Sequence, residues 1–214
     1  MKKQILIILT AIAAATSLAA ADAGKLTFVT GSVEVNSGKG WQKASLGAMV
    51  NEADKVRTGS KGTVIISLKS GATLKLKSDS QISLSAVGTA TTIDVEGGSV
   101  FSKVDRRTAG QTYKIRAQTM VAAVRGTEFY FAYGRKKKDK SDLWLCVNEG
   151  QVNVTDSSTK SEVNVNAGEG IVIPTDKAIP KPKPYEWTKK LNWNMDAEKG
   201  EVEELNLFSA LGLG

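Results

Sequence analysis

The residues whose types and spacing could do chemistry are concentrated in one motif, made of Arg125, Gly126, Thr127, Glu128 and Phe129. A guanidinium and a carboxylate this close together can pair with each other or bind a charged partner. The small and aromatic residues around them form no helical stripe, whereas two strands joined by a corner at Gly126 accommodate the sequence. We favour a structural role, in which Arg125 is buried and its guanidinium binds backbone carbonyls, because a buried charge without partners is costly. A charged corner that faces a partner is the alternative.

The usual catalytic side chains are missing. The sequence has no histidine, which excludes Ser-His and Cys-His dyads and every histidine-ligated metal site. The single cysteine, Cys146, lies in the apolar run Leu143–Val147, where a buried, inert thiol is expected. Two carboxylates alone can serve a glycosidase, but no motif marks such a pair. The sequence therefore predicts no cofactor, no metal and no enzymatic activity.

A basic run follows the motif and offers a second kind of binding chemistry, through Arg135, Lys136, Lys137, Lys138 and Lys140. We interpret it first as a solvated hairpin loop whose charges discourage edge-to-edge pairing. The alternative is contact with an anionic envelope polymer or lipid, which the net charge of +7 permits but does not specify. No platform for stacking bases accompanies the run, so we expect no nucleic acid partner.

Aromatic residues near the C-terminus could bind a sugar or a partner helix; they are Tyr185, Trp187 and Trp193. We favour a different interpretation, in which this tail folds back on the preceding domain. Trp187, Leu191 and Met195 recur at four-residue spacing, which predicts a short helix with one apolar face. Packing that face on the domain would stabilise a helix too short to persist alone.

The elements that must position these residues are predicted to be β-strands. From Lys25 to Ile173 short runs alternate between apolar and polar residues, and all four prolines follow this region. A body without proline keeps every backbone N–H available for a sheet. We predict an all-β sandwich, roll or short solenoid over residues 24–173, a stiff Pro/Lys linker over 174–184 and a partly helical tail over 185–214.

One hairpin is clear within this body. Val64–Leu68 and Thr73–Lys77 flank a turn at Gly71, and the alternation predicts that Lys75 and Lys77 point to water. A Gly-x-Val segment also recurs at unequal spacing, beginning at Gly31, Gly98 and Gly150. We interpret these as similar strand starts in quasi-symmetric positions rather than as a regular repeat.

The N-terminus has the parts of a secretory signal peptide. A basic start precedes an apolar core and small residues up to Ala23, with plausible cleavage after Ala21 or Ala23. An uncleaved membrane anchor is the alternative, because the stretch is nearly long enough to span a bilayer. We favour cleavage of residues 1–23, which leaves no transmembrane span and places the protein in the periplasm or outer envelope.

Several short motifs occur in a fixed order along the chain. They are Gly31-Ser-Val33, Trp41-Gln-Lys-Ala44, Ala53-Asp-Lys-Val-Arg-Thr-Gly59, Ser70-Gly-Ala-Thr-Leu74, Gly98-Ser-Val100, Arg125-Gly-Thr-Glu-Phe129, Val147-Asn-Glu-Gly-Gln-Val152 and Ala167-Gly-Glu-Gly170. This order resembles the FecR-like domain family of periplasmic all-β modules. The resemblance implies a binding or scaffolding role without naming a ligand.

A signalling FecR-type regulator resembles a three-part protein with a cytoplasmic sigma-binding segment, one membrane span and the periplasmic domain. Here only Met1 to about Ala23 precede the domain, so we expect no sigma-binding segment. Our main hypothesis is an exported, non-catalytic module that binds an envelope protein in signalling or assembly. A second is a structural protein that binds peptidoglycan or lipopolysaccharide, and a third is an enzyme with paired carboxylates.

Overall fold

Alternating apolar and polar residues form short strands in the computed structural model, which describes residues 21–106, 108–137, 140–174 and 177–203. The all-β fold class is confirmed. The signal-peptide prediction concerns mainly residues 1–20, which lie outside these ranges. The end of the tail, residues 204–214, also lies outside them.

The strands of the described residues are β1 (Asp22–Thr30), β2 (Val33–Asn36), β3 (Trp41–Lys43), β4 (Met49–Asn51), β5 (Lys55–Thr58), β6 (Thr63–Leu68), β7 (Ala72–Leu76), β8 (Gln81–Ala86), β9 (Ala90–Val104), β10 (Thr112–Ala117), β11 (Met120–Val124), β12 (Thr127–Lys137), β13 (Lys140–Glu149), β14 (Gln151–Asp156), β15 (Glu162–Asn166) and β16 (Gly170–Ile173). Two 3-10 helices follow, η1 (Glu186–Lys190) and η2 (Ala197–Lys199).

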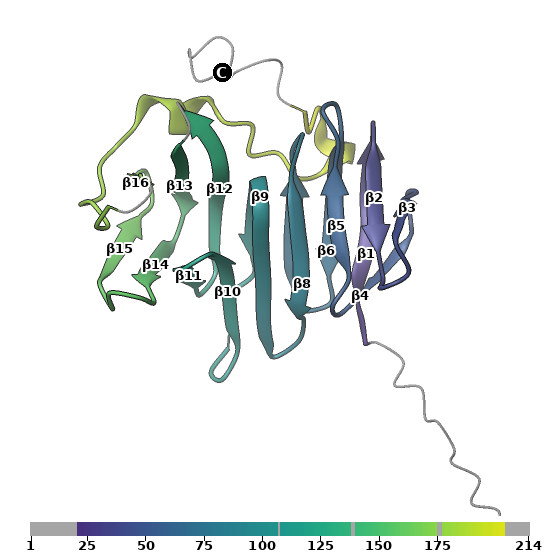
Figure 1. Ribbon diagram of the computed structural model, residues 1–214, viewed down its shortest axis with the longest axis horizontal. Coiled ribbons are helices and arrows are strands. Elements are labelled where there is room, and N and C mark those ends of the chain that lie inside the picture. The colour runs from purple at the N-terminus through teal and green to yellow at the C-terminus, as the bar shows by residue number, and fades with distance from the viewer. Residues whose placement is uncertain (1–20, 107, 138–139, 175–176, 204–214) are drawn as a thin grey trace, which may run out of the picture.

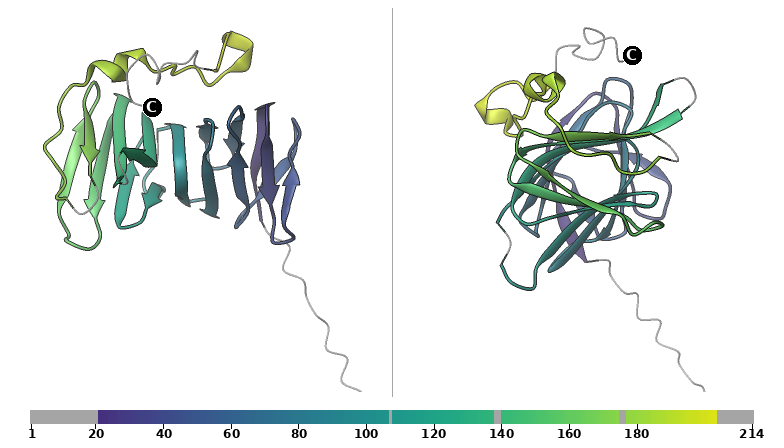
Figure 2. Two further views of the ribbon diagram at one scale, coloured as in Figure 1. Left: turned by 45° about the horizontal axis from the view of Figure 1, so that its top comes forward. Right: turned by 90° about the vertical axis from the view of Figure 1, so that its left-hand side faces the viewer.

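The strands form two sheets that face each other across the core. Sheet A has the order β4-β1-β6-β7-β9-β12-β13-β16. Sheet B has the order β3-β2-β5-β8-β9-β10-β11-β14-β15. Both orders rise almost steadily, so the chain advances along the long axis of the molecule while it passes between sheets (Figure 1). The right-hand view of Figure 2 looks along this axis and shows the strands around a central region, which the buried apolar side chains fill.

Strand β9 belongs to both sheets. Its first half pairs with β8 and β10 in sheet B, and its second half pairs with β7 and β12 in sheet A. The chain changes sheets at Gly98, whose φ is +83°. This shared strand joins the two layers covalently near the middle of the molecule.

The recurring Gly-x-Val segments mark crossings between the sheets. Gly31 separates β1 from β2, Gly98 lies at the switch within β9, and Gly150 separates β13 from β14. Gly126 lies at the same kind of crossing, between β11 and β12. All four glycines have a positive φ, between 65° and 84°. The quasi-symmetric positions predicted from the sequence are therefore the corners where the chain leaves one sheet for the other.

The predicted hairpin is confirmed, but one of its lysines is buried. Strands β6 and β7 pair antiparallel with Ile66 opposite Leu74, and Gly71 supplies a turn with φ +76°. The prediction that Lys75 points to water is wrong, since this residue is 0% exposed. Lys75 does project from the outer face of sheet A, yet the C-terminal tail covers it.

Candidate functional site

The described part of the tail, residues 185–203, forms a strap across the outer face of sheet A. Trp187 packs against Trp144 of β13 and Tyr130 of β12, with ring centroids 5.5 and 6.2 Å apart. Trp193 packs edge-on against Phe101 of β9 at 5.3 Å. The strap thus forms a second apolar cluster, separate from the core between the sheets.

The local structure of the strap differs from the predicted helix. Residues 186–190 form the single 3-10 helix η1, and residues 191–195 belong to no helix or strand. In this irregular stretch Leu191, Trp193 and Met195 all belong to the apolar cluster on sheet A. The packing of the apolar residues is therefore as predicted, while their spacing reflects a strand-like period of two after η1.

Polar side chains on the opposite side of the strap fold it upon itself. The Asn192 side-chain amide donates to the Glu201 and Glu203 carbonyls at 2.9 and 3.2 Å. The Asn194 amide donates to the Gly200 and Glu201 carbonyls at 3.1 and 3.2 Å. These bonds give the backbone carbonyls of the strap the hydrogen-bond donors that a helix or sheet would otherwise provide.

Lys75 links the strap to the sheet beneath it. Its Nζ donates to the carbonyl oxygens of Asn192 and Asn194 at 2.6 and 2.7 Å and lies 4.3 Å from the centroid of the Phe101 ring. A buried ammonium needs such acceptors, because desolvation without them is costly. The strap is consequently held by a charged group as well as by apolar contact.

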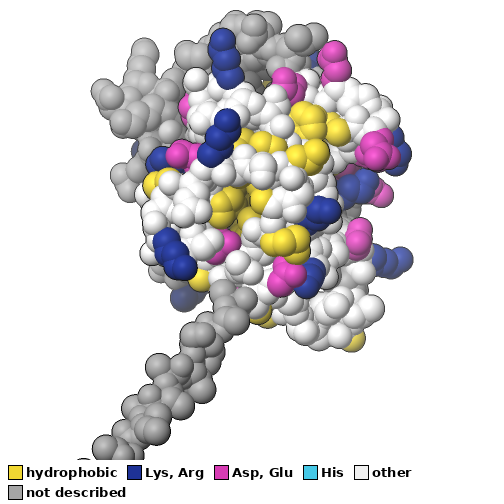
Figure 3. Space-filling view, turned by 90° about the vertical axis from the view of Figure 1, so that its right-hand side faces the viewer, with side chains coloured by type: hydrophobic (Ala, Val, Ile, Leu, Met, Phe, Trp, Pro, Cys, Tyr) yellow, Lys and Arg dark blue, Asp and Glu magenta, His cyan; other side chains and the backbone are white. Residues whose placement is uncertain are grey.

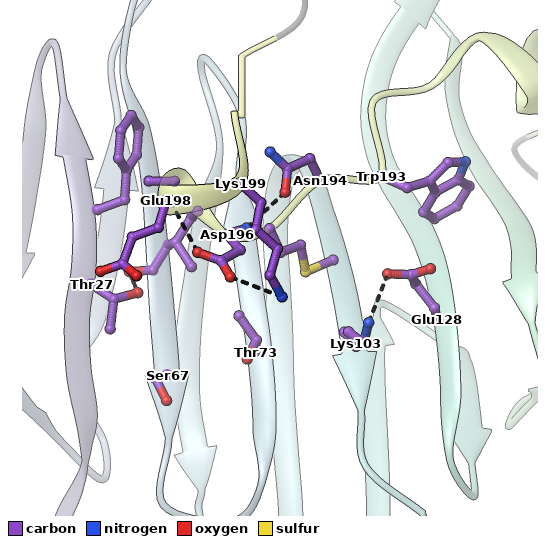
Figure 4. Close-up of a pocket in the computed structure, with 14 residues that line it drawn as sticks. Thr27, Ser67, Thr73, Lys103, Glu128, Trp193, Asn194, Asp196, Glu198 and Lys199 are labelled. Carbon is purple, nitrogen blue, oxygen red and sulfur yellow. Dashed lines mark hydrogen bonds and ion pairs between the residues drawn. The ribbon is translucent and has the colours of Figure 1, made fainter. Parts of the chain in front are cut away.

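A groove of about 490 Å³ lies between the strap and sheet A, and Figure 4 shows its side chains. The sheet contributes polar side chains from neighbouring strands and the strap contributes the facing wall. The lining residues are Thr27 and Phe28 of β1, Ile65 and Ser67 of β6, Thr73 of β7, Lys103 of β9, Glu128 of β12, and Trp193 to Lys199 of the strap. This volume is in the usual range for a pocket that binds a small ligand or part of a peptide.

Charged groups line both walls of the groove. On the sheet, Lys103 Nζ lies 3.8 Å from Glu128 Oε1. On the strap, the backbone N–H of Glu198 donates to Asp196 at 3.0 Å and Lys199 Nζ lies 3.2 Å from it. The Glu198 N–H, followed by Lys199, lowers the pKa of the Asp196 carboxyl. The groove therefore offers fixed charges of both signs beside hydroxyl groups.

The sequence-predicted motif is divided between the core, the groove and the surface. Phe129 is buried in the core and the Thr127 hydroxyl donates to the Gln151 carbonyl at 3.1 Å. Glu128 is nearly buried, lines the groove and accepts a hydrogen bond from the Asn148 amide. The prediction that Arg125 is buried is wrong, because its side chain is exposed.

We expect Arg125→Ala to change the free energy of unfolding by no more than about 0.5 kcal/mol, as for most exposed positions. Gly126→Ala is the matched change at the next residue and should be clearly destabilising. Gly126 has φ +81°, and an added Cβ would lie 2.8 Å from Arg106 Cα. Thermal melts of both variants test this ordering, and an Arg125→Ala chain that melts well below the Gly126→Ala chain would reverse it.

The remaining candidate residues from the sequence lie in two other places. Tyr185, Trp187 and Trp193 belong to the strap, and Lys183 Nζ lies 5.0 Å from the centroid of the Tyr185 ring. The basic run is at the tip of the β12–β13 hairpin, where Lys137 pairs with Lys140. Residues 138–139 and the side chains of 135–142 are outside what the structure describes.

A second cavity, of about 370 Å³, lies where the β10–β11 turn meets the ends of β14 and β16. Met120, Leu143 and Ile173 give it an apolar lining, and Asp156 and Tyr133 add polar groups. Sequence reasoning did not identify this cavity, because its residues come from distant strands. The Asp156 carboxylate accepts from the Ser158 hydroxyl at 2.7 Å and the Ser158 N–H at 2.9 Å.

These bonds predict an acid dependence for the β14–β15 turn. The Ser158 hydroxyl, the largest cause, lowers the pKa of Asp156 to about 2, against about 3.9 in an unfolded chain. A lowered pKa stabilises the fold above the unfolded value, and this contribution is lost as the pH falls from about 4 towards 2. Carboxyl chemical shifts followed by NMR should give an Asp156 midpoint near 2, and a midpoint near 3.9 would contradict the prediction. The stability advantage of the wild-type chain over Asp156→Asn should shrink over the same interval.

Neither a cluster of metal-ligating side chains nor a long apolar helix occurs among the described residues. These residues contain no cluster of three or more acidic or cysteine side chains placed to hold a metal ion. None of their helices combines the length and apolar character that crossing a bilayer requires.

The arrangement defines an all-β domain of two sheets with a covered outer face and a polar groove. Comparison with known families adds a more specific finding: the family described as FecR protein matches residues 54–153. The match runs from the turn before β5 into β14. It confirms the resemblance drawn from the ordered Gly-x-Val and Arg-Gly-Thr-x-Phe segments.

Solved structures share this fold. Two crystal structures of a candidate anti-sigma factor from Parabacteroides distasonis ATCC 8503, at 1.65 and 2.50 Å resolution, are similar with a TM-score of 0.52 and 17% identity. The similarity covers 61% of this chain and 59% of that protein. No curated protein is similar enough to count as a match. At this identity the likeness concerns the fold alone.

Proposed function

We propose that this protein is an exported, non-catalytic binding module of the bacterial envelope, which contacts another envelope protein in signalling or assembly. The FecR domain supports the signalling context. The observation that carries the proposal is the groove between sheet A and the strap, with its charges of both signs. Such a surface suits a polar peptide segment, whose backbone and side chains need donors and acceptors of both kinds.

The groove is open to substitution without disturbing the core. Thr27 on β1 is exposed and lines the groove, so Thr27→Trp should fill it. Thr112 on β10 is also exposed but lies in sheet B, away from the strap, which makes Thr112→Trp the matched control.

Affinity capture from envelope extract with the full-length tagged chain tests the proposal. We expect a specific envelope protein to be recovered with the wild-type and Thr112→Trp chains and to be lost with Thr27→Trp. Capture of no specific protein, or equal capture by Thr27→Trp, would count against binding in this groove.

A second candidate function is the structural binding of peptidoglycan or lipopolysaccharide. Trp193 lines the groove together with Asp196 and Glu198, and an aromatic ring beside carboxylates suits the apolar faces and hydroxyl groups of a sugar. The basic run at 135–140 would add attraction to anionic polymer. Co-sedimentation with purified sacculi that weakens with salt, and that Thr27→Trp abolishes, would favour this function over a protein partner.

Export is part of the proposal and predicts the first residue of the mature chain. Strand β1 begins at Asp22. Ala23 is buried, and its carbonyl accepts from the Lys69 N–H at 2.9 Å. Cleavage after Ala21 would keep the strand whole, whereas cleavage after Ala23 would remove a core residue. Intact-mass measurement on cell-derived protein should therefore give a chain that begins at Asp22, and a mass that retains residues 1–18 would indicate an anchored protein.

A further inference from the structure

Strand β15 is the edge strand of sheet B, at the left-hand end of the molecule in Figure 1. Two hydrogen bonds bracket its ladder with β14, from the Asp156 N–H to the Ser161 carbonyl and from the Ala167 N–H to the Gly150 carbonyl. Hydrogen-bonded and non-hydrogen-bonded pairs alternate along an antiparallel ladder, so the odd-numbered residues of β15 are the ones bonded to β14. The N–H and C=O groups of the even-numbered residues therefore point away from the sheet.

Two of these even-numbered residues have open backbone groups. At Asn166 the N–H donates to the Glu169 carboxylate at 2.9 Å, and the carbonyl accepts from the Glu169 N–H at 3.0 Å. At Glu162 and Asn164 the outward N–H and C=O groups make no hydrogen bond within the residues that the structure describes. The linker after β16 pairs with β16 and not with β15. The open edge thus runs from Glu162 to Asn164.

This open edge is complementary to itself. If a second copy adds antiparallel about a two-fold axis at Val163, Glu162 of each copy lies opposite Asn164 of the other. Each hydrogen-bonded pair exchanges two bonds, so the two pairs give four backbone bonds between the copies. The Glu162 carboxylate then faces the Asn164 amide, and the two half-buried Val163 side chains meet.

The neighbouring registers fit worse. An axis at Glu162 would place two carboxylates directly opposite each other, which is destabilising. An axis at Asn164 would place Glu162 opposite Asn166, whose backbone groups are already bonded to Glu169. The register centred on Val163 is therefore the one that the open groups select.

Charges beside the open edge complete the match. The same register sets Lys160 opposite Asn166 of the other copy, where the Glu169 carboxylate is held on the outer side of the strand by the Asn166 N–H. Neither Lys160 nor Glu169 belongs to an ion pair in the part of the chain that the structure describes. Two copies thus bring together two pairs of opposite charges.

We propose that this protein associates with a second copy of itself through β15, in the register centred on Val163, so that sheet B continues across both molecules. Four backbone bonds and two exposed ion pairs make a weak interface, and the extent of association depends on protein concentration. The groove lies on sheet A, so each copy keeps its own and the pair presents two. A partner with two matching segments would bind such a pair more tightly than a single copy.

Disulfide trapping in the full-length chain tests the register. The Cα atoms of a non-hydrogen-bonded antiparallel pair lie about 4.5 Å apart, a separation that a disulfide spans. Mild oxidation of a Val163→Cys chain should therefore link two copies, while Cys146 stays buried and unreacted. The matched control is Ser161→Cys, also half-buried on this segment, whose two copies would lie about 14 Å apart at ~3.4 Å per residue. We expect at least tenfold more covalent dimer from Val163→Cys.

A proline variant separates the edge from the fold. Asn164→Pro removes an N–H that points away from β14, so the ladder within the chain keeps its bonds. Asn164→Thr changes the same side chain and keeps the N–H. In sedimentation velocity over a range of concentrations we expect the Thr chain to dimerise and the Pro chain to stay monomeric, with the far-UV circular dichroism of both unchanged. Adding Asn164→Pro to Val163→Cys should lower the yield of covalent dimer at least fivefold.

The opposite end of the molecule is the other surface through which copies could associate. Leu46 and Met49 are 69% and 50% exposed there, and Figure 3 shows apolar side chains gathered on this end. A dimer that persists in Asn164→Pro but is lost in Leu46→Ser/Met49→Ser would assign association to that end and overturn the proposal. Equal cross-linking of Val163→Cys and Ser161→Cys would overturn the register. A chain that is monomeric at every concentration and gives no covalent dimer would overturn the association itself.

Discussion

A Gly98→Ala chain is expected to lose about 3 kcal/mol of stability and to melt roughly 6–12 °C below the wild-type protein. Gly98 has φ +83°, and an added Cβ would lie 2.4 Å from Ser80 Cα and 2.5 Å from the Asp79 carbonyl oxygen. Backbone atoms cannot yield as a flexible side chain can, so both the strain and the clash remain in the folded state. The position is also the point where β9 changes sheets, so a local shift there disturbs both layers.

The neighbouring glycine provides the control. An added Cβ at Gly97 would meet no atom within 4 Å, and its φ is outside the left-handed region. Gly97→Ala should therefore melt within a degree or two of the wild-type chain. Differential scanning calorimetry of the two variants measures the difference, and similar melting temperatures would mean that the crossing tolerates a side chain.

The sequence identifies these crossings because the constraint is local. A glycine two residues before a β-branched residue indicates a positive φ just before a strand. The freedom of glycine to adopt a positive φ and the preference of a β-branched residue for a strand both depend on only a few consecutive residues. The β6–β7 hairpin follows from the same kind of signal, through Gly71 and the alternation around it. Motif order along the chain then sufficed to predict the FecR domain that the family match confirms.

Errors arose where a distant segment decides the environment of a residue. Lys75 has the alternation of a solvent-facing lysine, but Asn192 and Asn194 cover it from more than a hundred positions away. The small, apolar neighbours of Arg125 predict an interior position, whereas the residue lies exposed at the corner between β11 and β12. Periodicity reports which face a side chain is on and not what covers that face.

The candidate groove could not be predicted from the sequence for the same reason. Its wall on sheet A comes from β1, β6, β7, β9 and β12, and its other wall comes from the strap. The sequence identifies Glu128 through the motif and Trp193 and Met195 through the aromatic and apolar residues of the tail, but it does not show that these residues meet in one groove. The docking of Trp187, Leu191 and Met195 was predictable, because apolar residues in a polar tail need a surface on which to pack. The local backbone of the strap was not predictable, because it depends on hydrogen bonds made by Lys75 and by the Asn192 and Asn194 side chains.

The strap contacts predict a chemical readout at the only cysteine of the chain. Cys146 is fully buried in the apolar cluster beneath the strap, and burial raises the pKa of its thiol. Removing both indole rings in Trp187→Ala/Trp193→Ala should release the strap, since each large apolar side chain contributes about 1.5–3 kcal/mol on burial. Without the strap the thiol pKa should fall towards its ordinary value, near 8.5. The thiolate fraction at pH 8 then rises, and thiolate is the reactive form.

We expect the rate of Cys146 modification by a thiol reagent at pH 8 to rise at least tenfold in this double variant, with the far-UV circular dichroism of the β domain retained. Trp41→Ala is the control, because Trp41 lies on β3 of sheet B beneath the Arg57 guanidinium, far from the strap. It should leave the modification rate unchanged.

If Cys146 stays protected in the double variant, then Lys75 and Leu191 hold the strap without the indole rings. Adding Lys75→Met to the double variant should in that case expose the thiol. A thiol that stays protected even then would mean that the strap does not control access to this face of sheet A, and the groove beside it would have to bind its partner without any movement of the tail.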